Sequence, residues 1–338
     1  FLLLDSEFLP MVAWLWFSTN VIGSDMLRVS KKLKMLKNPI RSFSKEKYSN
    51  LEKRTEEARC TLNGIQHDLL CSPTPALAEL EAEAQRKLAI LSKAEQSFLF
   101  QRSNISWYQD GDCGSSYFHK LMALRRSQNH IHLLTGSAGE RYETRKAIHD
   151  HCLQHFSDFL GGPSSLSLFD PQDIVLLLNH QCSQAQSDML QAEFTNAEIK
   201  EAFFSLPRNK SCGPDGYSSE FFVGCWSVIG HEVISAIKEF FKSGQILKQW
   251  NSTTLVLIPK TRNASNIGDF RPISCLNTLY KVISRLLTGR LKEALQPVIS
   301  HAQSAFMPGR LLAENVLLAT ELIQGYKKKN ISPRAMLK

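Results

Sequence analysis

The sequence lacks several patterns that define whole classes of protein. Its eight cysteines are scattered and no Cys-x-x-Cys occurs, which argues against a zinc ribbon or a disulfide scaffold and favours a reducing compartment. No signal peptide is visible, and the apolar stretch 8–17 is far shorter than the roughly twenty residues that span a bilayer. We therefore expect an intracellular protein, nuclear or cytoplasmic, without a membrane segment.

The pattern that would define a metal site is also incomplete. His151 and His155 are spaced four residues apart on an expected helix that also carries Cys152, which is a spacing that can hold zinc. However, there is no His-Glu-x-x-His motif and no second ligand pair of fixed spacing. An amphipathic helix with polar histidines is the better interpretation, and we expect no metal site in this chain.

Acidic residues are scarce where basic residues gather. Residues 248–338 contain 14 Lys/Arg and only 4 Asp/Glu, a local surplus of ten positive charges that exceeds the net charge of +8 for the whole chain. A second basic run, 28–54, has 10 Lys/Arg against 2 Glu. Segregated positive charge of this kind is what binding to a phosphate backbone requires, so the composition favours a polyanionic partner.

The first third of the chain predicts long helices. An apolar stripe marks one or two helices over 26–70, which Pro39 is expected to kink or divide. The run 71–75 predicts a turn, with Thr74 as N-cap and Pro75 at the first helical position, and a second helix follows to about Arg102. We expect an antiparallel helical hairpin, whose basic face is either solvated or used in nucleic-acid binding.

The middle of the chain predicts shorter elements. Residues 130–134 alternate like a strand and 135–139 could turn that strand into a hairpin, while 161–165 is the best candidate for a linker. Thr195 and Glu198 then form a capping box that begins a helix. These changes divide the chain into 1–102, 103–193 and 194–338.

A second hairpin carries the first candidate site. Residues 255–258 predict a short buried strand that Pro259 ends, and a polar loop over 261–268 forms an expected flexible tip before a second extended segment. Lys260 and Arg271 would then stand at facing ends of the hairpin. A lysine supplies a point charge and an arginine a planar fork, so the two could clamp a polyphosphate. The alternative is a surface hairpin with solvated charges.

Five motifs in one order resemble a known family. The resemblance is carried by Asn209-Lys-Ser-Cys-Gly-Pro-Asp-Gly216, Leu257-Ile-Pro-Lys260, Asp269-Phe-Arg-Pro-Ile-Ser274, Tyr280-Lys-Val-Ile-Ser284 and Gln303-Ser-Ala-Phe-Met-Pro-Gly-Arg310. Together they resemble the fingers half of a reverse transcriptase from a plant LINE-type (non-LTR) retrotransposon. Upstream, Trp107, Gly111-Asp112 and Tyr117-Phe-His119 resemble the connector that precedes the polymerase in such polyproteins.

The resemblance implies a fold, partners and roles. It implies an α-rich α+β chain: a long helical hairpin followed by the fingers part of a right-hand polymerase fold, with palm and thumb missing. Lys260 and Arg271 would contact the triphosphate of the incoming dNTP in the full-length enzyme. Lys210, Gln303 and Arg310 would lie along the RNA template or the RNA–DNA duplex.

The carboxylates that the family's chemistry requires are missing from this sequence. Such polymerases hold two Mg²⁺ ions on carboxylates, yet this chain contains no Asp-Asp, no acidic residue after Glu321 and no endonuclease motif. We therefore expect a truncated RNA-directed DNA polymerase that binds nucleic acid at most and is inactive alone. The rival interpretation is a non-enzymatic helical protein-interaction module derived from a decayed element.

Overall fold

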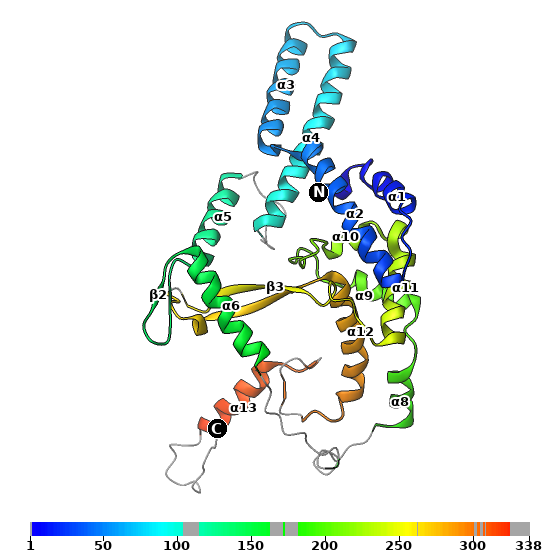
Figure 1. Cartoon of the computed structure of the whole chain (residues 1–338). Helices are drawn as coiled ribbons and strands as arrows, with labels where there is room; N and C mark the ends of the chain where they lie inside the picture. Colours follow the sequence, from blue (N-terminus) through cyan, green and yellow to red (C-terminus); the bar gives the residue numbers. More distant parts are fainter. Residues whose placement is uncertain are drawn as a thin grey trace. The chain divides into compact units, whose positions relative to one another are not determined.

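The structure is a computed structural model in which helices predominate (Figure 1). It describes residues 2–103, 115–162, 172, 182–261, 263–300, 303–304, 307 and 309–324. The motif residues Trp107 and Gly111-Asp112, and most of the predicted linker at 161–165, lie outside the described residues. No helix in the described part of the chain is both long enough and apolar enough to cross a membrane.

The elements follow one another in a mostly helical order. The α-helices are α1 (Phe8–Ser18), α2 (Asp25–Tyr48), α3 (Leu51–Cys71), α4 (Pro75–Ser103), α5 (Ser115–Asn129), α6 (Arg145–Gly161), α8 (Gln184–Gln191), α9 (Asn196–Phe204), α10 (Ser219–Gly224), α11 (Trp226–Ser243), α12 (Thr278–Leu295) and α13 (Leu312–Gln324). The strands are β1 (Leu134–Thr135), β2 (Arg141–Tyr142), β3 (Thr253–Pro259) and β4 (Phe270–Leu276). They form two antiparallel pairs, β1 with β2 and β3 with β4.

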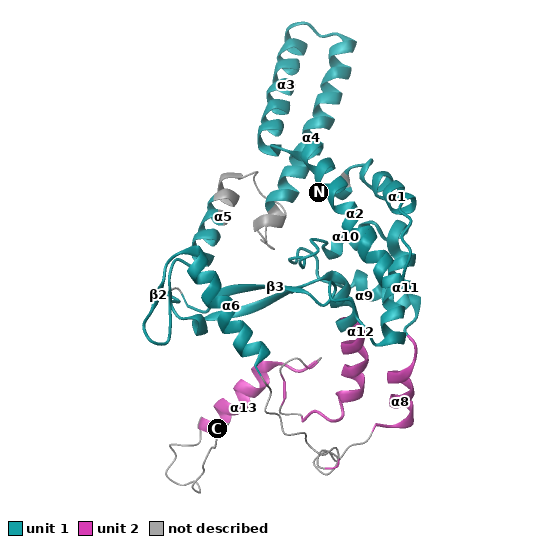
Figure 2. Ribbon diagram, viewed as in Figure 1, with its two compact units in different colours: residues 1–164, 194–284 teal, residues 165–193, 285–338 magenta. Residues whose placement is uncertain are grey.

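The chain divides into two compact units (Figure 2). The first contains residues 1–164 and 194–284, and the second contains residues 165–193 and 285–338. Compactness therefore groups the first helices with four of the five family motifs, whereas the fifth, at 303–310, belongs to the second unit. The three-part division at 102 and 193 concerns which part of a longer polyprotein each segment corresponds to, and it stays a prediction.

The core of the first unit lies between α2 and α11. Ile229, Val233 and Ile237 of α11 are fully buried and recur every four residues, so they line one face of that helix. Helix α2 packs against α11 and buries Val29 and Leu33. Two amphipathic helices that are far apart in the sequence thus bury their apolar faces against each other. Neither helix could bury its apolar face alone.

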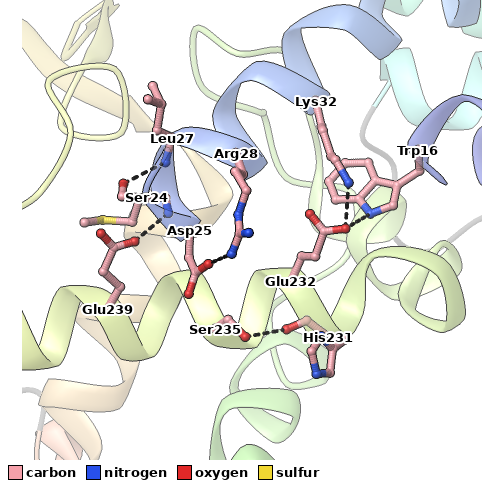
Figure 3. A network of polar contacts seen from close by, with 11 residues as sticks. Trp16, Ser24, Asp25, Leu27, Arg28, Lys32, His231, Glu232, Ser235 and Glu239 are labelled. Carbon is pink, nitrogen blue, oxygen red and sulfur yellow. Dashed lines mark hydrogen bonds and ion pairs between the residues drawn. The ribbon is translucent and has the colours of Figure 1, made fainter. Parts of the chain in front are cut away.

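A polar network crosses the same interface (Figure 3). The Glu232 carboxylate of α11 accepts hydrogen bonds from Lys32 Nζ at 2.7 Å and from Trp16 Nε1 at 3.0 Å. The Lys32 ammonium also lies 5.1 Å from the centre of the Trp16 ring, within range of a cation–π interaction. Because the Lys32 side chain is only 10 % exposed, Glu232 is the group that balances its buried charge.

Helix α2 is fixed at three further points by residues from the second half of the chain. Glu239 accepts a hydrogen bond from the backbone N–H of Met26 at 2.7 Å, next to the Ser24 N-cap (Figure 3). Trp250 Nε1 donates to Ser30 Oγ at 2.7 Å. The Tyr217 hydroxyl donates to the Leu33 carbonyl, also at 2.7 Å. Since these bonds span about two hundred residues of sequence, helical periodicity could not predict them.

Helices α3 and α4 form the predicted antiparallel hairpin. Thr74 Oγ1 accepts from the backbone N–H of Leu77 and Pro75 is the first helical residue, so the predicted turn chemistry is confirmed. Pro39 does not divide the helix, because α2 continues through Pro39 to Tyr48. The chain instead breaks at Asn50, whose left-handed backbone (φ 51°) separates α2 from α3.

Two other local predictions have different outcomes. The capping box is confirmed: Thr195 Oγ1 accepts from the Glu198 N–H at 3.1 Å, and the Glu198 carboxylate accepts from the Thr195 N–H at 2.7 Å. The strand expected over 130–134 is much shorter, because β1 begins only at Leu134 and pairs with two residues of β2.

The second unit contains α8, the C-terminal part of α12 and α13. The Arg290 guanidinium of α12 donates to the Ala192 carbonyl and, at 3.2 Å, to the Glu193 carbonyl just after α8. Helix α13 exposes most of its apolar side chains, among them Val316, Leu317 and Leu318, each more than half exposed.

Candidate nucleic-acid interface

The β3–β4 hairpin positions the two cations of the predicted clamp. In its register Ile258 pairs with Arg271 and Pro259 pairs with Phe270. The ladder continues one residue further, because the Lys260 N–H donates to the Asp269 carbonyl at 2.8 Å. Residues directly opposite each other share a face, and side chains alternate along a strand. Lys260 and Arg271 therefore lie on the same face as diagonal neighbours, a relation that brings Cβ atoms to within about 7–8 Å.

Both side chains have charge available to a ligand. Lys260 and Arg271 are exposed, and neither forms an ion pair within the described part of the chain. Lys260 Nζ donates to the Gly268 carbonyl at 2.7 Å, which uses one of its three donors and no opposite charge. The hairpin thus offers a point charge and a planar fork on one face.

Hydrogen bonds connect the tip of this hairpin to its own strand and to β1. The Asp269 carboxylate accepts from the backbone N–H groups of Ser265 at 3.4 Å and Asn266 at 3.1 Å. On the other side, the Thr135 N–H of β1 donates to the Ser265 carbonyl at 2.7 Å, and Thr135 forms a bridge with Asn266. The β1–β2 hairpin therefore fixes the tip that follows Lys260. Arg262 lies outside the described residues.

The expectation of a buried strand at 255–258 is wrong. Leu255, Val256 and Ile258 are 36 %, 41 % and 40 % exposed, and Ile273 on β4 is 43 % exposed. A run of consecutive apolar residues predicts a buried strand, because both of its faces are apolar. In the described part of the chain β3 pairs only with β4.

The loop that carries Lys210 is held at the start of α12. Asn277 is buried, accepts from the Asp215 N–H at 3.2 Å and donates to the Gln249 carbonyl at 2.7 Å. A Cβ on Gly213 would lie 2.2 Å from Asn277 Oδ1, so only glycine fits there. Because the loop backbone is fixed at these points, Lys210 projects from a structured turn and is exposed.

Sequence reasoning missed two residues that shape this loop. Asn277 precedes α12, where an asparagine indicates only a helix cap. Lys281 lies one turn into α12 and donates from Nζ to the Ser211 carbonyl at 2.9 Å. Its place within the motif that begins at Tyr280 was the available signal, but its partner 70 residues away was not predictable from spacing.

The one carboxylate in the loop has an altered proton affinity. Burial raises the pKa of Asp215, and this effect exceeds the opposing influence of the Tyr217 N–H and of the Lys37 and Lys281 ammonium groups. Asp215 Oδ1 accepts from the Tyr217 N–H at 3.0 Å, so the carboxylate serves the turn itself.

Gln303 and Arg310 belong to the second unit. The Arg310 guanidinium donates to the carbonyls of Ser300 at 2.5 Å, Gln303 at 2.7 Å and Ile299 at 3.3 Å. It therefore closes the turn after α12. The structure brings Gln303 and Arg310 together with each other, while Lys210, Lys260 and Arg271 belong to the first unit.

The described residues contain no group of three or more His, Cys, Asp or Glu side chains that could hold a metal ion. Of the three histidines of α6, His151 and His155 contact aromatic rings. The His151 ring stacks on Tyr142 at 4.3 Å, and the His155 ring stacks on Phe159 at 6.3 Å.

The chain is similar to proteins of transposable elements. It is 28 % identical over 281 residues to the "Transposon TX1 uncharacterized 149 kDa protein" of Xenopus laevis, a match that covers 80 % of this chain and 21 % of that protein. It is 29 % identical over 116 residues (33 % of this chain, 12 % of the relative) to the "Retrovirus-related Pol polyprotein from type-1 retrotransposable element R1" of Bradysia coprophila. The corresponding R2 polyprotein of Nasonia vitripennis is 26 % identical over 152 residues, which are 44 % of this chain and 14 % of the relative.

The matches therefore extend over about a fifth or less of each relative's length. No protein-family model matches the sequence.

Proposed function

We propose that the chain is the connector and fingers segment of a reverse transcriptase from a plant non-LTR retrotransposon, and that alone it binds nucleic acid without polymerising. The similarity to transposable-element proteins over 80 % of the chain supports the origin. The observation that carries the function is the register of the β3–β4 hairpin, which puts Lys260 and Arg271 on one exposed face. The named relatives come from animals, and plant origin rests on the resemblance alone.

The two cations suit different parts of a triphosphate. Lys260 provides a compact ammonium with three donors, and Arg271 a guanidinium that can hold two oxygens at once. In the full-length enzyme they would grip the incoming dNTP, with the template strand along Lys210, Gln303 and Arg310. Of these, Arg310 donates to three backbone carbonyls, so its template role would require it to keep those bonds or exchange some of them.

Chemistry requires groups beyond these cations. Magnesium ions, when held by carboxylates, stabilise the charge that develops on the transferred phosphoryl group. The described residues do not fit that task, since they contain no candidate metal-binding group and the Asp215 carboxylate is committed to the Tyr217 N–H. The role proposed for this chain is accordingly to bind and to orient phosphates, with palm and thumb supplied by the same polyprotein.

Binding to an RNA–DNA duplex tests this function. The purified chain is titrated with a labelled duplex between about 50 and 200 mM salt, and affinity should fall steeply because phosphate contacts release counterions. Lys210→Ala should weaken binding to all sequences alike and reduce the salt slope by about one. The matched control is Lys87→Ala on exposed α4. Absent or salt-insensitive binding would contradict the proposal, as would Mg²⁺-dependent primer extension by this chain.

The clamp is tested separately with inorganic tripolyphosphate. We expect weak binding, with a Kd of about 1 mM, that is lost in the Lys260→Ala/Arg271→Ala double variant. The matched control removes the same two residue types from α4, as Arg86→Ala/Lys87→Ala. Equal binding of tripolyphosphate by the two double variants would show that Lys260 and Arg271 do not form the proposed clamp.

The second candidate is a helical interaction module, which the exposed apolar side chains of the α3–α4 hairpin favour. Leu70, Leu80 and Ile90 are 85 %, 50 % and 62 % exposed, whereas Leu91 and Ala94 are buried between the two helices. If the hairpin binds a protein, replacing the three exposed residues with glutamine should abolish binding of that protein. The change should leave duplex binding unchanged if the chain is a reverse transcriptase segment.

A further inference from the structure

Seven of the eight Lys and Arg residues of α2 fall into two sets, and the eighth, Lys31, is exposed and forms no ion pair within the described residues. Arg28 pairs with Asp25, Lys32 with Glu232, and Lys47 with Asp5 and Glu7. Lys32 and Lys47 thus pair with carboxylates of other segments, and Arg28 pairs within α2. The other set, Lys34, Lys37, Arg41 and Lys45, forms no ion pair within the described residues.

The second set forms a continuous stripe. Lys34, Lys37, Arg41 and Lys45 recur at intervals of three, four and four residues. At 3.6 residues per turn they occupy about 80° of the helix circumference and extend for about 16 Å along the axis. Lys34, Arg41 and Lys45 are exposed, and Lys37 is half-buried. On α2 itself no carboxylate interrupts the stripe, because Glu46 lies on another side of the helix. From the neighbouring loop, the Asp215 carboxyl interacts with Lys37 at one end of the stripe's contact with that loop.

The stripe adjoins the loop that carries Lys210. Lys37 Nζ lies 3.7 Å from the position that a Cβ on Gly216 would occupy. Lys37 also favours the charged form of the Asp215 carboxyl, and Arg41 acts in the same way on the Tyr217 hydroxyl. The contact is fixed by the bond from the Tyr217 hydroxyl to the Leu33 carbonyl. Cations from two distant parts of the sequence therefore share one surface.

We infer that the α2 stripe and the loop 208–216 form a single binding surface for the phosphate backbone of nucleic acid. The inference rests on the proposed function and extends it to a helix in the N-terminal segment. A stripe of about 16 Å faces about five phosphates of one strand at 3.4 Å each. A lipid surface fits less well, since Val29, Leu33 and Leu36 of α2 are buried in the fold and Met35 alone is a largely exposed apolar side chain of this helix.

A triple substitution tests the surface. Lys34→Ala/Arg41→Ala/Lys45→Ala removes three exposed charges, and alanine preserves helix formation. The matched control is Arg86→Ala/Lys87→Ala/Lys93→Ala on α4, which removes the same residue types from another exposed helix. A glutamine version of each triple variant provides a second test if an alanine version does not fold. Binding is measured with single-stranded RNA, with an RNA–DNA duplex and with vesicles containing phosphatidylserine.

We expect the α2 variant to lose about tenfold or more in nucleic-acid affinity at low salt, and its salt slope to fall by about two to three. The control should match the wild type. A loss in either nucleic-acid arm supports the surface and identifies whether single strand or duplex is bound. Unchanged affinity in both arms overturns it, as does an equal loss in the control or vesicle binding as tight as nucleic-acid binding.

Failure of this inference is distinguishable from failure of the proposed function. If the wild-type chain binds with a steep salt dependence and only Lys210→Ala weakens it, the proposed function stands and the α2 surface does not. If the wild-type chain binds neither RNA nor the duplex, both are overturned.

Discussion

The α2–α11 interface and the β3–β4 hairpin combine the same kinds of residue in opposite ways. At the interface, Val29 and Val233 are fully buried and the nearby cation, Lys32, is balanced by Glu232. On the hairpin, Val256 is 41 % exposed and Arg271 has no ion-pair partner in the described part of the chain. The first arrangement stabilises the fold, whereas the second leaves apolar surface and charge available for binding.

This contrast indicates which residues stabilise the fold and which are available to bind a ligand. A cation that is paired with a carboxylate beside buried apolar side chains contributes to folding. Removing one member of the pair leaves the other buried and unpaired, which lowers the stability of the fold. An unneutralised cation on an exposed hairpin contributes little to folding, so its loss should affect ligands. Three experiments test this contrast.

The largest effect is expected from Glu232→Leu. The substitution leaves the Lys32 ammonium and the Trp16 N–H without their acceptor in a mostly buried site, so the free energy of unfolding should fall by about 3 kcal/mol. Denaturant unfolding followed by circular dichroism measures the change. Glu232→Gln keeps an acceptor oxygen and should lose less. Equal stability of Glu232→Leu and the wild type would show that the hydrogen bonds to Glu232 do not stabilise the fold.

A matched pair of valine substitutions sets the two regions side by side. Val233→Thr replaces a methyl with a hydroxyl at a fully buried position and should lower the free energy of unfolding by about 2 kcal/mol. Val256→Thr makes the same change on the exposed hairpin and should alter it by less than about 0.5 kcal/mol. Chemical denaturation of both variants provides the comparison, which fails if their losses are similar.

The smallest effect is a dependence on alkaline pH. Burial raises the pKa of the Cys225 thiol from 9.0 to about 12. The unfolded thiol ionises first as pH rises, so the stability that the neutral buried thiol provides is complete below pH 9 and is lost between pH 9 and about 12. Near pH 10 the loss should be about 1 kcal/mol. Unfolding of Cys225→Ala from pH 8 to 10 should be less pH-dependent than that of the wild type, and parallel curves would contradict this origin.

The fold was predictable wherever the signal was local. Thr74 and the Thr195–Glu198 pair identified helix starts, because an N-cap needs only residues within one turn. The division that was one of two outcomes expected at Pro39 does not occur, since a proline within a helix can be tolerated when tertiary contacts hold both sides. The burial of strand 255–258 was predicted wrongly because periodicity records that a strand is apolar and not what covers it.

The candidate site was predictable in part for the same reason. Lys260 and Arg271 follow from the sequence of one hairpin, in which strand alternation and a short loop determine the geometry. Asn277 and Lys37 did not emerge, since each acts on the loop 208–216 from a distant segment. The roles proposed for Lys210, Gln303 and Arg310 come from the resemblance, and their place in nucleic-acid binding stays a prediction.

The hydrogen bond between Ser30 and Trp250 has a consequence for synthesis of the chain. It joins residues 220 positions apart, and a ribosome adding about 5–20 residues per second needs about 10–45 s to make the intervening segment. During that interval α1 and α2 exist without α11, so the side chains of Trp16 and Leu33, which are buried in the complete fold, cannot pack against that helix. Newly made α1 and α2 therefore remain exposed to chaperones and proteases until α11 has been translated.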